Sequence, residues 1–380
     1  MHPFKSLLLL IFFSISPLYS QYLPLSESAE VSLLTCGKGD QLYSLFGHTA
    51  IRINDVGRNI DFVYNYGAFD FDTPNFVVRF SKGDLQYFVT KDPFLDFMYT
   101  YQYEQRSVYE QYLSMPLEQK QQLFDALNKS LESDKKYYTY KFIDRNCTTM
   151  VADILNAALA DNSLRKVREV DADVTYREVL YPYFDQHFYE QLGTSIIFGS
   201  KVDEKADKVF LPEELLESVN VAKVDGRPLL QKSRTLLQFP APKNEMSWWN
   251  NPYTYILLML LIVLANSRIV TVVYFIVAGA LGLFFTVAGS YSYHGELAYN
   301  YNALLFNPAL LLIAFFLISK NMKAVYYLAI FCLIGFLVYF LIMLNKVHLL
   351  IVLPVLIAHL FLIGRLVRRY RAHFIAAAKV

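Results

Sequence analysis

Apolar residues are distributed very differently in the two parts of the chain. Charged residues recur throughout 21–245, whereas 253–366 is nearly free of them. The second part contains five apolar runs, at about 252–266, 269–288, 303–319, 323–344 and 347–366. Each run approaches or meets the roughly 20 residues that an α-helix needs to cross a bilayer. The pattern predicts a globular domain at 21–245 and an all-α block of five transmembrane helices at 246–380.

The residues between these two parts are typical of a chain entering a membrane. Pro240 and Pro242 form a short, stiff linker, and Trp248 and Trp249 follow it. Tryptophan favours the membrane–water interface, because its ring is apolar while its N–H needs a polar partner. We therefore expect the first transmembrane helix to begin shortly after these residues.

The N-terminal twenty residues have the pattern of a secretion signal. Lys5 provides the positive charge, and the apolar core at 7–13 is too short to span a bilayer. Small residues follow near the expected cleavage point, at Ser14, Ser16 and Ser20. The sequence predicts a signal peptide at 1–20 rather than a first transmembrane helix.

Basic residues of the C-terminal part predict its orientation. Seven of them fall in the turns and the tail on one side, at Arg268, Lys320, Lys323, Arg368, Arg369, Arg371 and Lys379. The loops expected on the other side, at 289–302 and 345–346, contain only Lys346. Because cytoplasmic loops are enriched in Lys and Arg, we expect a cytoplasmic C-terminus and an extracytoplasmic domain.

The domain at 21–245 has a mixed α+β pattern. Strand-like segments occur at Glu30–Cys36, His48–Asn54, Ile60–Tyr66 and Gly83–Val89, and helical spacing occurs at 116–132 and 147–160. A turn centred near 56–57 joins the second and third strands into a hairpin. In that register His48 lies opposite Asn65 and Arg52 lies opposite Asp61, whereas a slip of one residue would bring a tyrosine beside His48.

Composition and charge exclude several classes of function. The formal net charge is +1, and no basic stripe supports nucleic-acid binding. The chain has three cysteines, and no CxxC, HExxH or paired Cys/His spacing is present, so we expect no metal site and no cofactor. Cys332 falls inside an apolar run, where it is expected to be inert.

Cys147 has the sequence context of a reactive thiol. Asn146 is a favourable N-cap, so Cys147 falls in the first turn of the predicted helix. A helix N-terminus favours the thiolate and can lower a cysteine pKa from about 8.5 into the range of roughly 3.5–7.5. A buried structural thiol, or a disulfide with Cys36, remains an alternative from position alone.

His48 and Asn65 complete a possible catalytic constellation with Cys147. A histidine at a strand start is often a core residue, but the predicted hairpin places an amide beside its ring. A nucleophile, a base and a residue that orients the base are the parts required for thiol catalysis.

Three segments resemble one known family: FGHTAIRI, VYNYGAFDFDTPNF and RNCTT. They are similar to the periplasmic domain of the Lnb-type lipoprotein N-acyltransferases, which belong to the circularly permuted papain-like group that includes lecithin:retinol acyltransferase. The similarity covers about 33–159, and the five apolar runs resemble the family's membrane module. It implies an α+β permuted papain-like domain followed by an all-α five-helix transmembrane domain, with Cys147 and His48 as catalytic residues. Asn65 is assigned from strand pairing instead.

This resemblance implies the reaction, the partners and the location. Cys147 would take an acyl chain from a phospholipid and pass it to the N-terminal amine of a lipoprotein's diacylglyceryl-cysteine. The protein would be a multi-pass protein of the bacterial inner membrane. His294 and Glu296, in the loop 289–302, would bind a lipid head group or the amine, although a tyrosine-rich interfacial loop is the simpler interpretation. A membrane-anchored cysteine peptidase or amidase, or a non-enzymatic scaffold, is the alternative.

Overall fold

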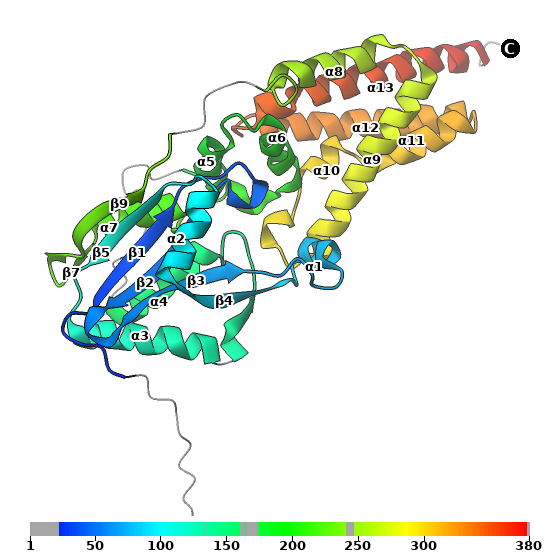
Figure 1. The fold of residues 1–380 in the computed structure, drawn as a ribbon. Helices are drawn as coiled ribbons and strands as arrows, with labels where there is room; N and C mark the ends of the chain where they lie inside the picture. The colour runs from blue at the N-terminus through cyan, green and yellow to red at the C-terminus, as the bar shows by residue number, and fades with distance from the viewer. Residues whose placement is uncertain (1–22, 133, 160–163, 165–173, 241–246, 378–380) are drawn as a thin grey trace, which may run out of the picture.

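The structure is a computed structural model that describes residues 23–132, 134–159, 164, 174–240 and 247–377. It consists of an N-terminal domain built on a β-sheet and a C-terminal helical block beside it (Figure 1). The signal peptide predicted at 1–20 lies outside the described residues.

The described part of the N-terminal domain forms a seven-stranded antiparallel sheet in the order β6-β4-β3-β2-β1-β5-β9. Its strands are β1 (Glu30–Cys36), β2 (His48–Asp55), β3 (Ile60–Ala68), β4 (Gln86–Pro93), β5 (Val108–Leu113), β6 (Tyr137–Thr139) and β9 (Leu230–Leu237). The first three agree closely with the prediction. The fourth begins three residues later than predicted, because Gly83 has a φ of 75° and terminates helix α1 (Phe76–Lys82).

Helices cover both faces of the sheet, because alternate strand residues point to opposite sides. On one face α3 (Leu117–Glu132) and α4 (Cys147–Leu159) pack with α7 (Pro212–Val221). Their shared core contains Leu33, Ile51, Tyr64, Leu123, Leu127, Val151 and Leu155. On the other face α2 (Phe94–Tyr103) places Phe97 and Tyr101 over Leu34, Ala50 and Val63.

Between β5 and β9 the chain adds the short pair β7 (Lys223–Val224) and β8 (Arg227–Pro228).

Among the described residues, three helices are long and apolar enough to cross a membrane: α9 (Arg268–Tyr291), α12 (Met322–Met343) and α13 (Leu349–Ala377). The other two predicted spans are shorter. Helix α8 (Pro252–Leu264) has 13 residues, about 20 Å, against a hydrocarbon core of roughly 30 Å. The run at 303–319 is divided into α10 (Asn302–Leu305) and α11 (Ala309–Ile318), because Pro308 cannot continue a helix. The described residues thus contain three helices of full span length, and the prediction of five spans is not confirmed.

A connecting segment joins the two parts through both apolar and polar contacts. It includes α5 (Tyr176–Leu180), α6 (Phe188–Ile197) and the 3-10 turn η5 (Ser200–Asp203). The apolar side of α6 packs against the core of the helical block with Phe188, Tyr189, Leu192, Ile196 and Ile197. Buried Arg177 binds Asp203 at 2.6 Å, and Asp203 also accepts a hydrogen bond from Tyr301 at 2.6 Å. Since Tyr301 belongs to the helical block, these bonds link the block to the N-terminal domain.

Candidate active site

The register of β2 and β3 differs from the predicted one. Asn65 pairs with Ala50 rather than with His48, a difference of two residues. The turn contains the 3-10 turn Val56–Arg58 and a left-handed Asn59, with a φ of 55°. The hairpin is therefore centred one residue later than predicted.

The predicted side-chain contacts are nevertheless present. A shift of two residues keeps each side chain on its own face of the sheet, so the partners meet diagonally. His48 Nε2 lies 2.5 Å from Asn65 Oδ1. Arg52 bonds both carboxylate oxygens of Asp61, at 2.7 and 2.8 Å. Both pairs that were expected to face each other directly therefore interact across a diagonal.

Asn146 caps α4, as predicted, and Cys147 is the first residue of the helix. Asn146 Oδ1 accepts a hydrogen bond from the Thr149 N–H at 3.0 Å, and the Asn146 N–H donates to Thr149 Oγ1 at 2.9 Å. The Asn146 amide also donates to the carbonyls of Phe142 and Phe210, at 2.7 and 2.8 Å. Four hydrogen bonds therefore hold Asn146, and the cap keeps the Cys147 thiol at the positive end of the helix dipole.

The Cys147 thiol and the His48 imidazole interact directly. Burial works to raise the pKa of Cys147, but the charge of His48 and hydrogen bonds from His48, the Thr49 N–H and the Thr148 hydroxyl outweigh it and lower that pKa. Burial works to lower the pKa of His48, but the Cys147 sulfur and the bonds to Cys147 and Asn65 raise it. Since Nε2 is bound to Asn65, Nδ1 is left to exchange a proton with the thiol. The arrangement favours a thiolate–imidazolium pair.

Gly67 lies between the two reactive side chains. The pairing of β3 with β4 is irregular between Tyr66 and Ala68, and Gly67 has a φ of 104°. A Cβ there would lie 3.7 Å from the Cβ of Cys147 and 3.8 Å from Cε1 of His48. Glycine adopts this backbone conformation without strain, and it leaves no side chain in contact with Cys147 and His48 at this position. Our sequence interpretation missed Gly67, although a glycine inside a strand pattern indicates a bulge or a close approach.

The segment before Cys147 is held by residues distant in the sequence. Paired backbone bonds between Lys141 and Arg145, at 3.0 and 2.9 Å, close its turn. The Ile143 N–H donates to Glu296 Oε1 at 3.1 Å. Asp144 forms ion pairs with Lys201 and Lys208. The loop that carries the thiol is thus attached to the loop 289–302 of the helical block.

His294 and Glu296 lie against the N-terminal domain. His294 Nε2 is 2.9 Å from the Phe80 carbonyl oxygen. Glu296 is only 1% exposed, and its Oε2 has no hydrogen-bond partner among the described residues. The substrate-binding role that we assigned to both stays a prediction. The bond from Ile143 to Glu296 shows a positioning contact that sequence reasoning missed, because it spans 153 residues.

The other cysteines have no comparable environment. Each of the three is a free thiol in the described part of the chain, so the possible Cys36–Cys147 disulfide is absent. Burial raises the pKa of Cys36 to about 12, which keeps it protonated and unreactive. Cys332 is buried within α12. The described residues contain no group of three or more His, Cys, Asp or Glu side chains that could hold a metal ion.

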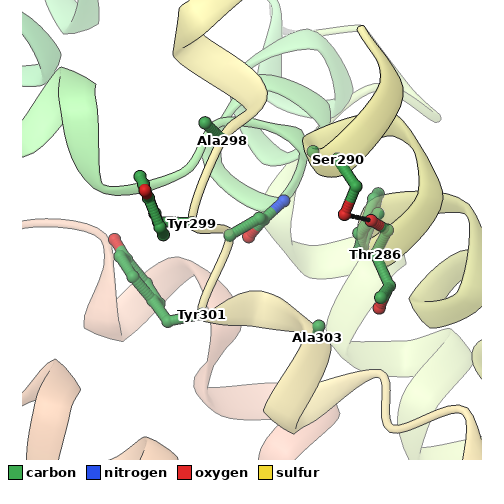
Figure 2. A pocket seen from close by; sticks show the side chains of 9 residues that line it. Thr286, Ser290, Ala298, Tyr299, Tyr301 and Ala303 are labelled. Carbon is green, nitrogen blue, oxygen red and sulfur yellow. Dashed lines mark hydrogen bonds between the residues drawn. The ribbon is translucent and has the colours of Figure 1, made fainter.

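A cavity of about 500 Å³ lies between the C-terminal end of α9 and the segment 298–303. Figure 2 shows Thr286 and Ser290 on the helix, and Tyr299 and Tyr301 on the facing segment. Hydroxyl groups and an amide line this cavity beside the buried ring of Phe285.

Residues 22–181 match the family model of the Lnb N-terminal periplasmic domain. The matched region contains His48, Asn65 and Cys147, and it ends before α6 and the helical block. Comparisons with curated proteins and with solved structures found no match. The match is consistent with an Lnb-type family, and together with the apolar helices it indicates a membrane protein.

Proposed function

We propose that this chain is a lipoprotein N-acyltransferase that uses Cys147 as its nucleophile. The observation that carries the proposal is the contact of a helix-start thiol with a histidine whose far nitrogen is bound by Asn65. This order of His48, Asn65 and Cys147 along the chain is that of a permuted papain-like enzyme. The donor would be a membrane phospholipid and the acceptor an envelope lipoprotein.

The first step would transfer an acyl chain to the enzyme. His48 Nδ1 takes the proton of the Cys147 thiol, and the thiolate attacks an ester carbonyl of the phospholipid. Backbone N–H groups in the first turn of α4, including that of Cys147, would stabilise the oxyanion. The ester C–O bond then breaks, the departing alkoxide takes the proton from His48, and a lysolipid leaves. The acyl chain remains on Cys147 as a thioester.

The second step would transfer the chain to the lipoprotein. The unprotonated α-amine of a diacylglyceryl-cysteine attacks the thioester carbonyl, and His48 accepts a proton from the attacking nitrogen. The C–S bond breaks, an amide is formed, and Cys147 is released as a thiolate beside the protonated His48. The enzyme returns to its starting state without a cofactor.

Membrane attachment fits this chemistry, because both substrates are lipids. Each CH₂ group moved from a bilayer into water costs about 0.8 kcal/mol, so a soluble enzyme would extract a long acyl chain only at great cost. We propose a multi-pass protein of the bacterial inner membrane, with the sheet domain periplasmic after removal of 1–20 and the C-terminus cytoplasmic. In that orientation α8 and the α10–α11 segment would cross as short spans.

The test is a trapped intermediate. Intact protein is incubated with phospholipid vesicles, the Cys147 thioester is detected by mass spectrometry, and a diacylated lipopeptide is then added. We expect thioester formation followed by transfer to the amine, loss of both in Cys147→Ala, and retention of both in Cys36→Ala. Hydrolysis of soluble peptides without any thioester from lipid would favour the peptidase. Unchanged lipoprotein N-termini in cells that carry Cys147→Ala would favour the scaffold.

A further inference from the structure

An exposed apolar surface follows shortly after Asn65 and Gly67 in the chain. It consists of Phe71, Val77, Val78 and Phe80, which we call the α1 face. Their exposed fractions are 67%, 72%, 66% and 45%. Phe69 and Phe76 support the face from inside, with ring centroids 4.8 and 5.1 Å from that of Phe71. The surface therefore has a packed aromatic base and is not a loose loop.

Helix α1 is attached to the end of a membrane-length helix. The Tyr293 N–H donates to the Lys82 carbonyl at 2.8 Å, and the Ser292 hydroxyl donates to the Ser81 carbonyl at 3.0 Å. Both donors directly follow the last residue of α9, Tyr291. Figure 1 shows α1 at this end of α9. If α9 crosses a bilayer, α1 lies at the level where it leaves the hydrocarbon core.

The polar residues around this contact match a membrane interface. Lys82 lies 5.8 and 5.6 Å from the ring centres of Tyr291 and Tyr293, and it is paired with Asp84 at 2.6 Å. Tyrosine and lysine are the residues that anchor proteins at the lipid head groups. The α1 face therefore adjoins the end of a helix that is long and apolar enough to cross a membrane, and lipid is the partner that this chemistry fits.

Aromatic rings connect the α1 face with the nucleophile. Phe76 contacts Phe69, Phe69 lies 5.1 Å from Tyr87, and Tyr87 stacks on Tyr140 at 4.4 Å. Tyr140 and Cys147 are both partly buried, and they pack against the same hydrophobic core. A series of aromatic contacts therefore runs from α1 to Tyr140, on the part of the core that Cys147 also packs against.

We propose that the α1 face inserts into the lipid leaflet and that an acyl chain reaches Cys147 along this aromatic path. The inference rests on the proposed function for its second half only. Insertion is a property of the surface, whereas delivery also requires that Cys147 accept acyl chains from lipid. The two halves are therefore tested separately.

Insertion is measured in the full chain, reconstituted into vesicles of phosphatidylethanolamine and phosphatidylglycerol. A nitroxide label is placed on Val77→Cys in a Cys147→Ser background, and its collision rates with oxygen and with a water-soluble nickel complex are compared. The matched control is Val56→Cys. Val56 is 81% exposed and lies in the turn between β2 and β3, at the end of the hairpin that is opposite His48. We expect the Val77 label to favour oxygen and the Val56 label to favour nickel. Equal preference for nickel, or contact of the Val77 label with added lipoprotein instead of lipid, would overturn the proposal.

Delivery is measured with Val77→Asp/Val78→Asp, with Val56→Asp as the control. We expect thioester formation from vesicles to slow roughly tenfold or more in the double variant, because two charges oppose insertion. The reaction of Cys147 with iodoacetamide should stay unchanged. The delivery role would be overturned if the double variant formed the thioester as fast as Val56→Asp. It would also be overturned if thioester formation and iodoacetamide alkylation slowed equally in the double variant. If the unmodified protein forms no thioester, the proposed function is refuted, and so is the delivery role that rests on it. Insertion is then decided by the label measurement alone.

Discussion

Asn65 reaches His48 diagonally across two strands: its Oδ1 lies 2.5 Å from His48 Nε2, while its own partner in the ladder is Ala50. An amide oxygen can only accept a hydrogen bond, so it places the proton on Nε2 and leaves Nδ1 free to accept the proton of Cys147. In the proposed mechanism Asn65 therefore acts through His48, as a positioning residue.

This relationship predicts unequal losses on substitution. His48→Ala should slow thioester formation by roughly 10²–10⁴-fold, the usual contribution of a general base. Asn65→Ala should slow it less, because orientation is only part of that contribution. Rates are measured by mass spectrometry of Cys147 over time, with His187→Ala as a histidine control outside the site. A loss in Asn65→Ala that equals or exceeds that of His48→Ala would show that the amide does more than orient the ring.

The thiolate–imidazolium pair predicts the pH dependence of thiol reactivity. The pKa of Cys147 is lowered and that of His48 is raised, and both shifts favour a thiolate beside a protonated imidazole. Alkylation of Cys147 by iodoacetamide should begin well below pH 8.5, about the pKa of an ordinary thiol. In His48→Ala the rise should move to higher pH. A Cys36→Ala background removes the second thiol of the domain, and an unshifted profile in His48→Ala would contradict the pairing.

Gly67→Ala should reduce activity more than its effect on stability explains. The substitution strains a φ of 104° and places a methyl group in contact with the Cβ of Cys147 and Cε1 of His48. Gly226→Ala is the matched control, because Gly226 has a φ of 76° and an added Cβ there contacts nothing within 4 Å. We expect both variants to lose thermal stability and only Gly67→Ala to lose thioester formation. Equal activity of the two variants would show that thioester formation does not require the absence of a side chain at position 67.

Local signals explain what could be predicted from the sequence. The cap at Asn146 and the alternating strand at His48 depend on neighbouring residues, and both were identified correctly. The hairpin register was wrong by two residues, because no sequence rule distinguishes the 3-10 turn at Val56–Arg58 from a tighter turn. The contact survived because an even shift preserves the faces of a strand.

Contacts between distant segments could not be predicted in the same way. Cys147 and Gly67 meet only when α4 packs on the sheet, and the hydrogen bond from Ile143 to Glu296 joins the two parts of the molecule. Apolar content predicted where the apolar helices lie but not their length, since Pro308 divides one run and α8 ends after 13 residues.

The buried pair of Arg177 and Asp203 should contribute strongly to stability. Removing the carboxylate in Asp203→Asn leaves a buried guanidinium without its counter-ion, which costs roughly 3–5 kcal/mol. The control is Glu30→Gln, because the side chains of Glu30 and Lys232 are each 38% exposed, and ion pairs that solvent reaches contribute about 0–1 kcal/mol. The thermal midpoint of the full protein in detergent is the measurement. Equal midpoints for the two variants would contradict the assignment.

The same pair predicts how stability depends on pH. Burial works to raise the pKa of Asp203, but Arg177, Tyr301 and Lys346 outweigh it and lower that pKa. A lowered carboxyl pKa contributes stability that is present above the unfolded value of about 3.9 and is lost as the pH falls through the folded value. The midpoint of the unmodified protein should therefore fall below about pH 4, and the fall should be smaller in Asp203→Asn.

Glu296 has two possible roles that its variants can separate. If Glu296 positions the segment before Cys147, the required feature is an oxygen that accepts the Ile143 N–H, and an amide supplies one. If it binds the acceptor amine, as we expected from the sequence, the required feature is the negative charge. Glu296→Gln keeps the first feature and loses the second, whereas Glu296→Ala loses both.

The two half-reactions then report on different features. Thioester formation involves only the lipid donor, so loss of positioning should slow it in Glu296→Ala, where the buried Ile143 N–H is left unpaired at a cost of roughly 1–3 kcal/mol. That corresponds to a loss of about 5- to 150-fold if the cost falls on the reactive geometry. We expect Glu296→Gln to form the thioester at nearly the normal rate, and Glu217→Ala, an exposed site on α7, to behave as the unmodified protein.

Transfer to a diacylated lipopeptide is measured separately on preformed thioester. A Glu296→Gln variant that is normal in the first step and slow in the second would show that the charge binds the amine. If Glu296→Gln is as slow as Glu296→Ala in the first step, the bond to Ile143 does not explain the role of Glu296 and the positioning assignment is wrong.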